Sequence, residues 1–150
     1  MSSAPRFLNI DLDLFHTRRF DAVVRALTSS TGRAGKMFIL HEDVTAFFPV
    51  GAKSRGAAKG HALRLETSRT HKTPSAAIRA IAAAVQSLPL RARTEWNSIR
   101  FKQLSLGVEQ ARSDQATKAC EITLDAQSIA LCAAIGCQVA LVVYSDHKVR

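Results

Sequence analysis

The sequence lacks the features by which several large classes of protein are recognised. Its apolar runs are short, as in AIAAAV at 80–85, whereas a helix that crosses a membrane needs about 18 apolar residues. The start, MSSAPRFLNIDLDL, has no basic segment followed by an uninterrupted apolar one, so we expect no secretion signal. The three cysteines, Cys120, Cys132 and Cys137, form no CxxC or CxxH pair and fall on apolar periodicities. We therefore expect a cytoplasmic protein with reduced, buried thiols, no membrane partner and no metal site.

The motifs of nucleotide-binding proteins and hydrolases are incomplete or missing. Residues 51–56 (GAKSRG) have the GxxxxG spacing of a phosphate-binding loop, but Ala57 and Ala58 stand where a lysine and a hydroxyl residue are required. The segment GRAGK at 32–36 fails in the same way, because Met37 follows it. There is no GxSxG motif, and the five histidines have no HxH, HExxH or HxxxH spacing. No motif identifies a catalytic residue, and no cofactor is expected.

Two carboxylates could nevertheless carry chemistry. Asn9, Asp11 and Asp13 alternate with apolar residues, so on a strand they share one face at a spacing of about 7 Å. Such a pair of carboxylates can bind a metal or act as acid and base. The alternative is a polar sheet face on which they form ion pairs with Arg64 or Lys102 of neighbouring strands. An enzyme that uses Asp11 and Asp13 is therefore our third hypothesis.

Hydrophobic periodicity predicts strands and helices in mixed order. Alternation predicts strands at 7–15, 61–68, 101–110 and 120–124, and either a strand pair or one long, bent strand over 36–50. The segment 137–144 is apolar on both faces toward its end, so we place it centrally in the sheet. Helical spacing predicts helices over 16–32, 73–88, 89–99 and 125–136.

Capping residues indicate where the helices begin and end. Thr73 is a good cap for a helix whose first residue is Pro74, and Asp125 is a good cap for the last helix. Gly136 is expected to end that helix in the left-handed conformation. In the short helix between them, Leu90 and Trp96 are the expected anchors in the core.

These elements fit a single domain that spans residues 1–150. The order is βα, two or three strands, α, two strands and αβ. It predicts an α+β fold with an antiparallel or mixed sheet of about five to seven strands and about three helices on one face. The embedded βαββαβ order favours a ferredoxin-like α/β sandwich. The sequence does not distinguish a monomer from a homodimer.

From about Thr73 onward the sequence resembles a family of small bacterial α+β domains. The resemblance rests on a helix running into SLP (87–89), an insert that contains Trp96, and the segment ITLDAQSIALCAAIGCQVALVVYS (122–145). The opening RFLNIDLDLF (6–15) is similar in style to the first strand of those domains. The resemblance covers about half of the chain and includes no catalytic motif. It implies a compact domain without an established activity, among relatives some of which are suspected immunity or accessory proteins.

Positive charge is the strongest compositional signal, and it is unevenly distributed. The net charge is +9, and residues 51–102 hold 11 lysines and arginines against two acids, which accounts for the whole excess. A local basic excess attracts a polyanion or an acidic partner. The residues expected to bind that partner are Lys53, Arg55, Lys59, Arg69, Lys72, Arg91 and Arg93.

The sequence therefore predicts a non-catalytic binding protein that engages an acidic protein through this basic surface. The alternative is a nucleic-acid-binding protein that uses the same cations without reading sequence. Nucleic acid ranks second because only Trp96 and Phe101 lie near these cations as rings that could stack a base. The segment 51–60 is expected to connect the two strands of a β-hairpin.

Overall fold

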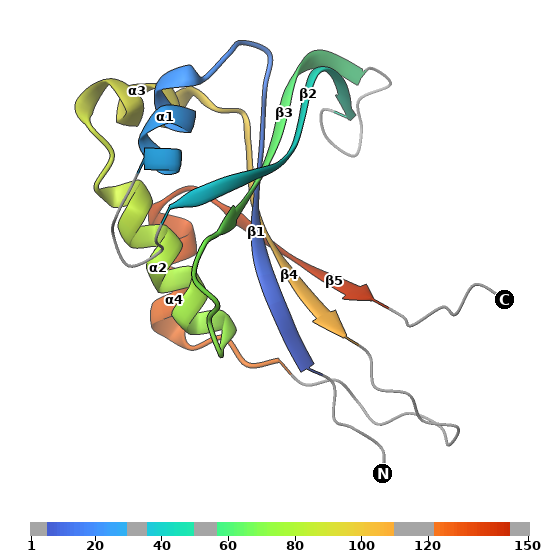
Figure 1. Ribbon diagram of the computed structural model, residues 1–150, viewed down its shortest axis with the longest axis vertical. Coiled ribbons are helices and arrows are strands. Elements are labelled where there is room, and N and C mark those ends of the chain that lie inside the picture. Colours follow the sequence, from blue (N-terminus) through green and yellow to red (C-terminus); the bar gives the residue numbers. More distant parts are fainter. Residues whose placement is uncertain (1–5, 30–35, 50–56, 110–121, 145–150) are drawn as a thin grey trace, which may run out of the picture.

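The fold is known from a computed structural model that describes residues 6–29, 36–49, 57–109 and 122–144. Five strands form one sheet, and four helices lie on one of its faces (Figure 1). The α+β prediction is thereby confirmed. In chain order the elements are β1 (Arg6–His16), α1 (Asp21–Ser29), β2 (Met37–Pro49), β3 (Ala57–Thr67), α2 (Pro74–Gln86), α3 (Leu90–Ser98), β4 (Phe101–Glu109), α4 (Ala126–Ala134) and β5 (Gln138–Tyr144).

The sheet is open and mixed, with the strand order β2-β3-β1-β4-β5. Only the β4–β5 pair is parallel; the other three neighbouring pairs are antiparallel. It follows that β1 and β2 run in the same direction with β3 between them, as do β3 and β4 with β1 between them. Helices cross over between the strands of each such pair. Because β5 adds a further, parallel strand beside β4, the ferredoxin-like assignment is not confirmed.

The alternating leucines of β1 explain why this strand is central. Leu12 is paired with Leu65 of β3 on one side and with Leu104 of β4 on the other. All three side chains are fully buried beneath the helices. The neighbouring Ile10 and Leu14 point the same way and are also buried, so one row of each strand forms the floor of the core.

The helix caps are those that the sequence predicts. The side-chain oxygen of Thr73 accepts a hydrogen bond from the Ala76 backbone N–H at 3.2 Å, and Asp125 accepts one from the Ser128 N–H at 2.7 Å. Gly136 has a φ of 70°, the left-handed conformation expected at the end of α4. These local signals therefore determine where α2 and α4 begin and where α4 ends.

The central position predicted for 137–144 is wrong, because among the described strands β5 lies at the edge of the sheet and is paired with β4 alone. Its side chains on the helix side stay exposed: Val139 at 41%, Leu141 at 55% and Val143 at 50%. An apolar run indicates a strand buried on both faces only where other elements cover it. Among the described helices, α4 contacts β5 but covers little of it (Figure 1).

Two further expectations are wrong. Residues 122–125 form no strand; Ile122 and Leu124 instead pack, partly buried, against the core just before α4 begins. Leu90 does not anchor α3, because its side chain is 81% exposed. Ala92 and Trp96 are buried instead, since residues four apart share one face of a helix.

The described cysteines behave as small core residues, as predicted. Cys132 and Cys137 are free and buried, and burial raises the pKa of both thiols, that of Cys137 to about 12. Both thiols are therefore protonated and unreactive at neutral pH. Cys120 lies outside the described residues. Among the described residues, no helix is both long enough and apolar enough to cross a membrane.

Candidate functional site

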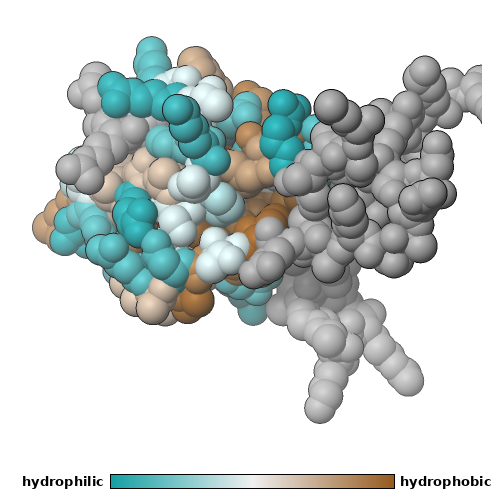
Figure 2. Space-filling view, turned by 90° about the horizontal axis from the view of Figure 1, so that it is seen from below, coloured by the Kyte–Doolittle hydropathy of each residue, from teal (hydrophilic) through white to brown (hydrophobic). Residues whose placement is uncertain are grey.

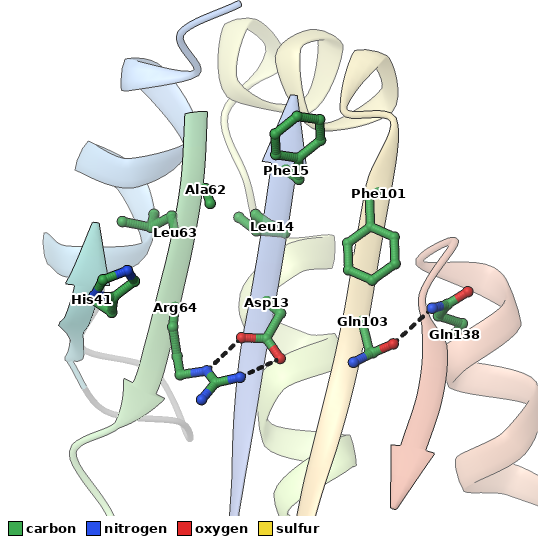
Figure 3. A pocket seen from close by; sticks show the side chains of 10 residues that line it. All are labelled: Asp13, Leu14, Phe15, His41, Ala62, Leu63, Arg64, Phe101, Gln103 and Gln138. Atoms are coloured by element: carbon green, nitrogen blue, oxygen red, sulfur yellow. Dashed lines mark hydrogen bonds and ion pairs between the residues drawn. The ribbon is translucent and has the colours of Figure 1, made fainter. Parts of the chain in front are cut away.

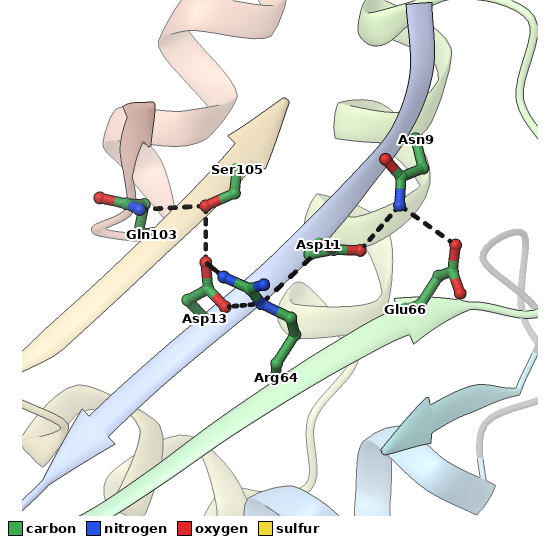
Figure 4. Close-up of polar contacts among 7 residues, drawn as sticks. All are labelled: Asn9, Asp11, Asp13, Arg64, Glu66, Gln103 and Ser105. Carbon is green, nitrogen blue, oxygen red and sulfur yellow. Dashed lines mark hydrogen bonds and ion pairs between the residues drawn. The ribbon is translucent and has the colours of Figure 1, made fainter. Parts of the chain in front are cut away.

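The sheet face opposite the helices, which we call the open face, is lined by polar and charged side chains. Asn9, Asp11 and Asp13 point to it as predicted, because side chains alternate along β1. The pairing register places Glu66 of β3 and Ser105 of β4 beside Asp11. Seven polar side chains thus meet on this face (Figure 4): Asn9, Asp11, Asp13, Arg64, Glu66, Gln103 and Ser105.

Arg64 is the cation at the centre of this group. Its Nε donates to Asp13 Oδ1 at 2.6 Å and its Nη2 donates to Asp13 Oδ2 at 3.2 Å, which makes a bidentate pair. The same Nε lies 3.9 Å from Asp11 Oδ2. Asp13 also accepts a hydrogen bond from Ser105 Oγ at 2.5 Å. The ion pair predicted between the carboxylate row and Arg64 is therefore present.

Lys102, the other predicted partner of these carboxylates, is not used. It is paired with Leu14 in the sheet, so its side chain points to the helix side. There its Nζ donates to the backbone oxygens of Trp96 and Ile99, at 3.1 Å each, and lies 5.5 Å from the centre of the Trp96 ring. Lys102 thus binds the C-terminal end of α3 and leaves the open face to Arg64.

Asp11 is the most perturbed carboxyl group of the open face. Burial raises its pKa from 3.8 to about 6; Arg64 opposes the rise, whereas Glu66 and Asp13 add to it. Asn9 Nδ2 donates to Asp11 Oδ1 at 3.1 Å and to Glu66 Oε1 at 3.3 Å. This group thus holds three carboxyl groups and one guanidinium, so the open face is locally acidic in a basic protein.

The side chain of Asn9 lies over Gly107, a residue that has no side chain of its own to block it. Gly107 is its partner on β4, and a Cβ built there would lie 2.3 Å from Asn9 Oδ1 and 3.1 Å from the Tyr144 ring. Any larger residue would displace Asn9 from Asp11 and Glu66. The polar network therefore depends on this glycine.

A cavity of about 560 Å³ opens on the same face, a volume within the usual range for small-molecule sites. An apolar row of Phe15, Ala62 and Phe101 lies side by side in register at one end of it. The side chains that line the cavity come from all five strands (Figure 3): His41 from β2; Ala62, Leu63 and Arg64 from β3; Asp13, Leu14 and Phe15 from β1; Phe101 and Gln103 from β4; and Gln138 from β5.

The polar wall of the cavity continues the hydrogen bonds of the open face. Gln138 Nε2 donates to Gln103 Oε1 at 2.7 Å, and Gln103 Nε2 donates to Ser105 Oγ at 3.0 Å. Through Ser105 this chain reaches Asp13 and Arg64. Side chains from β5, β4, β1 and β3 are thereby held in one continuous arrangement.

This geometry bears on the hypothesis of a carboxylate enzyme without deciding it. Asp13 lines the cavity, whereas Asp11 does not. Asp13 already accepts bonds from Arg64 and Ser105. Within the described ranges, no group of three or more histidine, cysteine, aspartate or glutamate residues could hold a metal ion. An enzyme that uses the two aspartates stays a prediction.

The cations predicted to form one surface are divided in the fold. Lys53 and Arg55 lie outside the described residues. Lys59 lies near the start of β3, whereas Arg69 and Lys72 follow its end, and the strand between them spans about 26 Å. Figure 2 views the molecule from below, the side on which β3 leads into α2 in Figure 1. Hydrophilic residues cover much of this view, with hydrophobic ones gathered beside the residues drawn in grey.

Several cations gather at the opposite end, where β1 leads into α1. Burial lowers the pKa of His16, and nearby Arg18, Arg100 and Lys102 lower it further. The start of β3 approaches the same point, because a Cβ at Gly60 would lie 2.3 Å from the His16 carbonyl oxygen. α3 also lies at this end, beside α1 (Figure 1). We define the basic end by four exposed cations: Arg18, Lys59, Arg91 and Arg100.

Arg93 and Glu95 of α3 have structural partners. Arg93 Nη2 donates to the backbone oxygens of Gln86 at 3.0 Å and Leu88 at 3.2 Å, which joins α3 to the end of α2. Glu95 Oε2 accepts from the Val23 N–H at 2.8 Å and so caps the N-terminal end of α1. The sequence does not reveal the contact of Glu95, because its partner Val23 lies 72 residues away.

The two rings considered for base stacking are also accounted for. Trp96 is 2% exposed, and its Nε1 donates to the Ile135 backbone oxygen at 3.0 Å. Phe101 lines the cavity on the open face. Trp96 is therefore a core residue, and Phe101, the first residue of β4, points to the open face.

No protein-family model, curated protein or solved structure matches the chain significantly. The resemblance of residues 73–145 to small bacterial domains therefore stays a prediction. The function is inferred from the described residues alone.

Proposed function

We propose that the protein is a non-catalytic binding protein that engages an acidic protein partner through the basic end. One observation carries the proposal. Arg18 and Arg100 lie near His16, Lys59 precedes Gly60 at the same point, and Arg91 belongs to α3, which lies at this end; none of the four forms a salt bridge within the described part of the chain.

The carboxylates provide the contrast, because most described ones are engaged inside the molecule. Glu66 accepts from Asn9, and Glu95 accepts from the Val23 N–H. Five others have a cation as partner: Asp11 and Asp13 with Arg64, Asp21 with Arg19, Glu109 with Arg6, and Asp125 with Arg79. The charge that remains for a partner is therefore mainly positive.

A protein partner is favoured over nucleic acid by the rings beside the cations. Three of the four cations are arginines, whose planar guanidinium groups bind carboxylates and phosphates alike in a bidentate manner, so the cations alone do not distinguish the two partners. Binding of single-stranded nucleic acid would add rings that stack on bases, but of the rings near these cations in sequence Phe20 and Trp96 are buried, and Phe101 lines the cavity on the open face. Binding to the carboxylates of an acidic protein requires only the exposed cations and no stacking rings.

The proposal narrows the set of residues predicted from sequence. It keeps Lys59 and Arg91, adds Arg18 and Arg100, and assigns Arg93 to the joint between α2 and α3. Arg69 and Lys72 are left out because they lie at the other end of β3. An immunity or accessory role stays a prediction of the sequence resemblance.

The test compares two charge reversals of equal size. One variant carries Arg18→Glu and Arg100→Glu at the basic end, and the control carries Arg69→Glu and Lys72→Glu, so both change the net charge equally. The probe is fluorescent polyglutamate, titrated in low salt and followed by anisotropy. We expect the first variant to weaken binding about tenfold or more and the control to weaken it about twofold.

Two outcomes would overturn the proposal. Equal weakening by both variants would mean that polyglutamate responds to net charge alone. Tighter binding of a single-stranded oligonucleotide with the same number of charges, falling log-linearly with salt concentration, would assign the basic end to nucleic acid instead.

A further inference from the structure

The cavity on the open face has no part in the proposed function, although its apolar row adjoins the basic end. It is lined by side chains of all five strands, and its polar wall is held by the bonds that join Gln138, Gln103, Ser105 and Asp13. Such a preorganised wall beside two aromatic rings is typical of a small-molecule site. The question is which chemistry this wall would accept.

The sign of the charge near the cavity indicates which kind of ligand its polar wall would accept. Asp11 and Asp13 lie beside a single guanidinium, that of Arg64, whose Nε and Nη2 are already directed at Asp13, and Glu66 lies beside Asp11. An anion placed here would be repelled, whereas a cation would be attracted.

The uncharged lining residues are compatible with a cation. The rings of Phe15 and Phe101 lie next to one another at one end of the cavity (Figure 3), and aromatic faces attract ammonium groups. Gln138 uses Nε2 toward Gln103, which leaves its Oε1 as an acceptor at the cavity wall. The carboxylate of Asp13 also lies at this wall.

We propose that the cavity binds a small organic cation, an ammonium group carried on an aromatic or branched apolar body. The apolar body packs against the row of Phe15, Ala62 and Phe101. The ammonium group donates hydrogen bonds to Asp13 and to Gln138 Oε1. The proposal thus adds a second site of opposite charge to that of the basic end.

The experiment uses three probes with a common phenyl body: 2-phenylethylamine, 2-phenylethanol and 3-phenylpropionate. Their binding to the full chain is measured by ligand-observed NMR at pH 7. We expect the amine to bind at least about tenfold more tightly than the alcohol, because a charge-assisted hydrogen bond is added, and the carboxylate to bind most weakly.

Two variants and one control locate the binding. Ala62→Leu fills the cavity beside Phe15 without changing a charge, and Asp13→Asn removes the proposed acceptor; each should weaken amine binding about tenfold or more. Glu109→Gln removes one charge from a residue that is paired with Arg6 and does not line the cavity. It should leave amine binding within about twofold of the original protein.

Because Asp13→Asn also removes the partner of Arg64 and can impair folding, Ala62→Leu decides the question. Failure of the amine to bind, preference for 3-phenylpropionate, or amine binding that Ala62→Leu leaves unchanged would each overturn the proposal. None of these results would bear on polyglutamate binding at the basic end, so the two proposals fail separately.

Discussion

The open face and the basic end differ in whether their charged side chains are paired. On the open face, Asp11 and Asp13 share Arg64, and hydrogen bonds from Ser105 and Asn9 hold them in place. At the basic end, Arg18, Lys59, Arg91 and Arg100 are exposed and have no salt bridge within the described residues. Most described carboxylates therefore have partners within the protein, whereas the cations of the basic end form no salt bridge within the described residues. Removing a charge from the two regions should have very different consequences.

The largest expected effect is on the open face. Replacement of Arg64 by leucine leaves Asp11 and Asp13 without their cation while both remain mostly buried. We expect the free energy of unfolding to fall by about 3 kcal/mol, the lower end for a broken buried ion pair because Arg64 is itself partly exposed. Urea denaturation at pH 7 measures it.

The matched control is Arg91→Leu at the basic end, which should change the free energy of unfolding by no more than about 0.5 kcal/mol. If the two substitutions had equal effects, the distinction between an internally used and a free cation would be wrong.

The next effect concerns the point where β1 and β3 meet at the basic end. In Gly60→Ala the new methyl group would lie 2.3 Å from the His16 carbonyl oxygen and 2.9 Å from Thr17 Cα, so the backbone must move. We expect a loss of about 2 kcal/mol in the free energy of unfolding. In Gly107→Ala the clash is with the Asn9 side chain, which can rotate, and about 1 kcal/mol is expected. Thermal denaturation should rank the two in this order; the reverse order would contradict the close approach at Gly60.

Asp11 gives the open face a dependence on pH. Its pKa in the folded protein, about 6, lies above the ordinary 3.8, so the folded state holds this proton more tightly than the unfolded state does. The stability that the protonated form contributes is fully present below pH 3.8 and is lost as the pH rises through about 6. The groups that face Asp11 are Arg64, which opposes the shift, and Glu66 and Asp13, which increase it.

The substitution Asp11→Asn should therefore raise the free energy of unfolding by about 1–2 kcal/mol at pH 7. At pH 3 the variant and the original protein should be equally stable. Denaturant titrations at the two pH values measure the difference, and a variant that is less stable at pH 7 would show that the ionised carboxylate stabilises the fold.

The smallest effect is expected at the basic end. Burial, and then Arg18 and Arg100, lower the pKa of His16. Replacing both arginines by glutamine should raise that pKa toward its ordinary value and change the free energy of unfolding by no more than about 0.5 kcal/mol. NMR titration of the His16 ring protons follows the pKa. An unchanged value would mean that these cations do not gather around His16.

Local signals in the sequence predict the elements well. The alternating Leu12 and Leu14, the caps Thr73 and Asp125, and the left-handed Gly136 each act within a few residues, and all are present as expected. Their physical causes, side-chain alternation and unsatisfied backbone groups, need no knowledge of the rest of the chain.

The position of each strand in the sheet and the contacts between distant strands could not be predicted from local signals. The apolar segment 137–144 indicates a buried strand, but only the sheet order shows that β5 lies at an edge. Arg64 and Asp13 are 51 residues apart, and Ser105 and Asp13 are 92 apart. Arg18 joins the basic end only because β1 ends beside α3 and the start of β4. Arg69 and Lys72, close to Lys59 in sequence, lie a strand's length away from it.

Backbone chemical-shift mapping with polyglutamate tests the division of charge most directly. We predict that ¹⁵N and amide proton shifts change at Arg18, Lys59, Arg91, Arg100 and their neighbours, with Arg69, Lys72 and the open face unaffected. Changes centred on Arg69 and Lys72, or spread over Asp11, Asp13 and Arg64, would contradict the assignment of the free positive surface to the basic end.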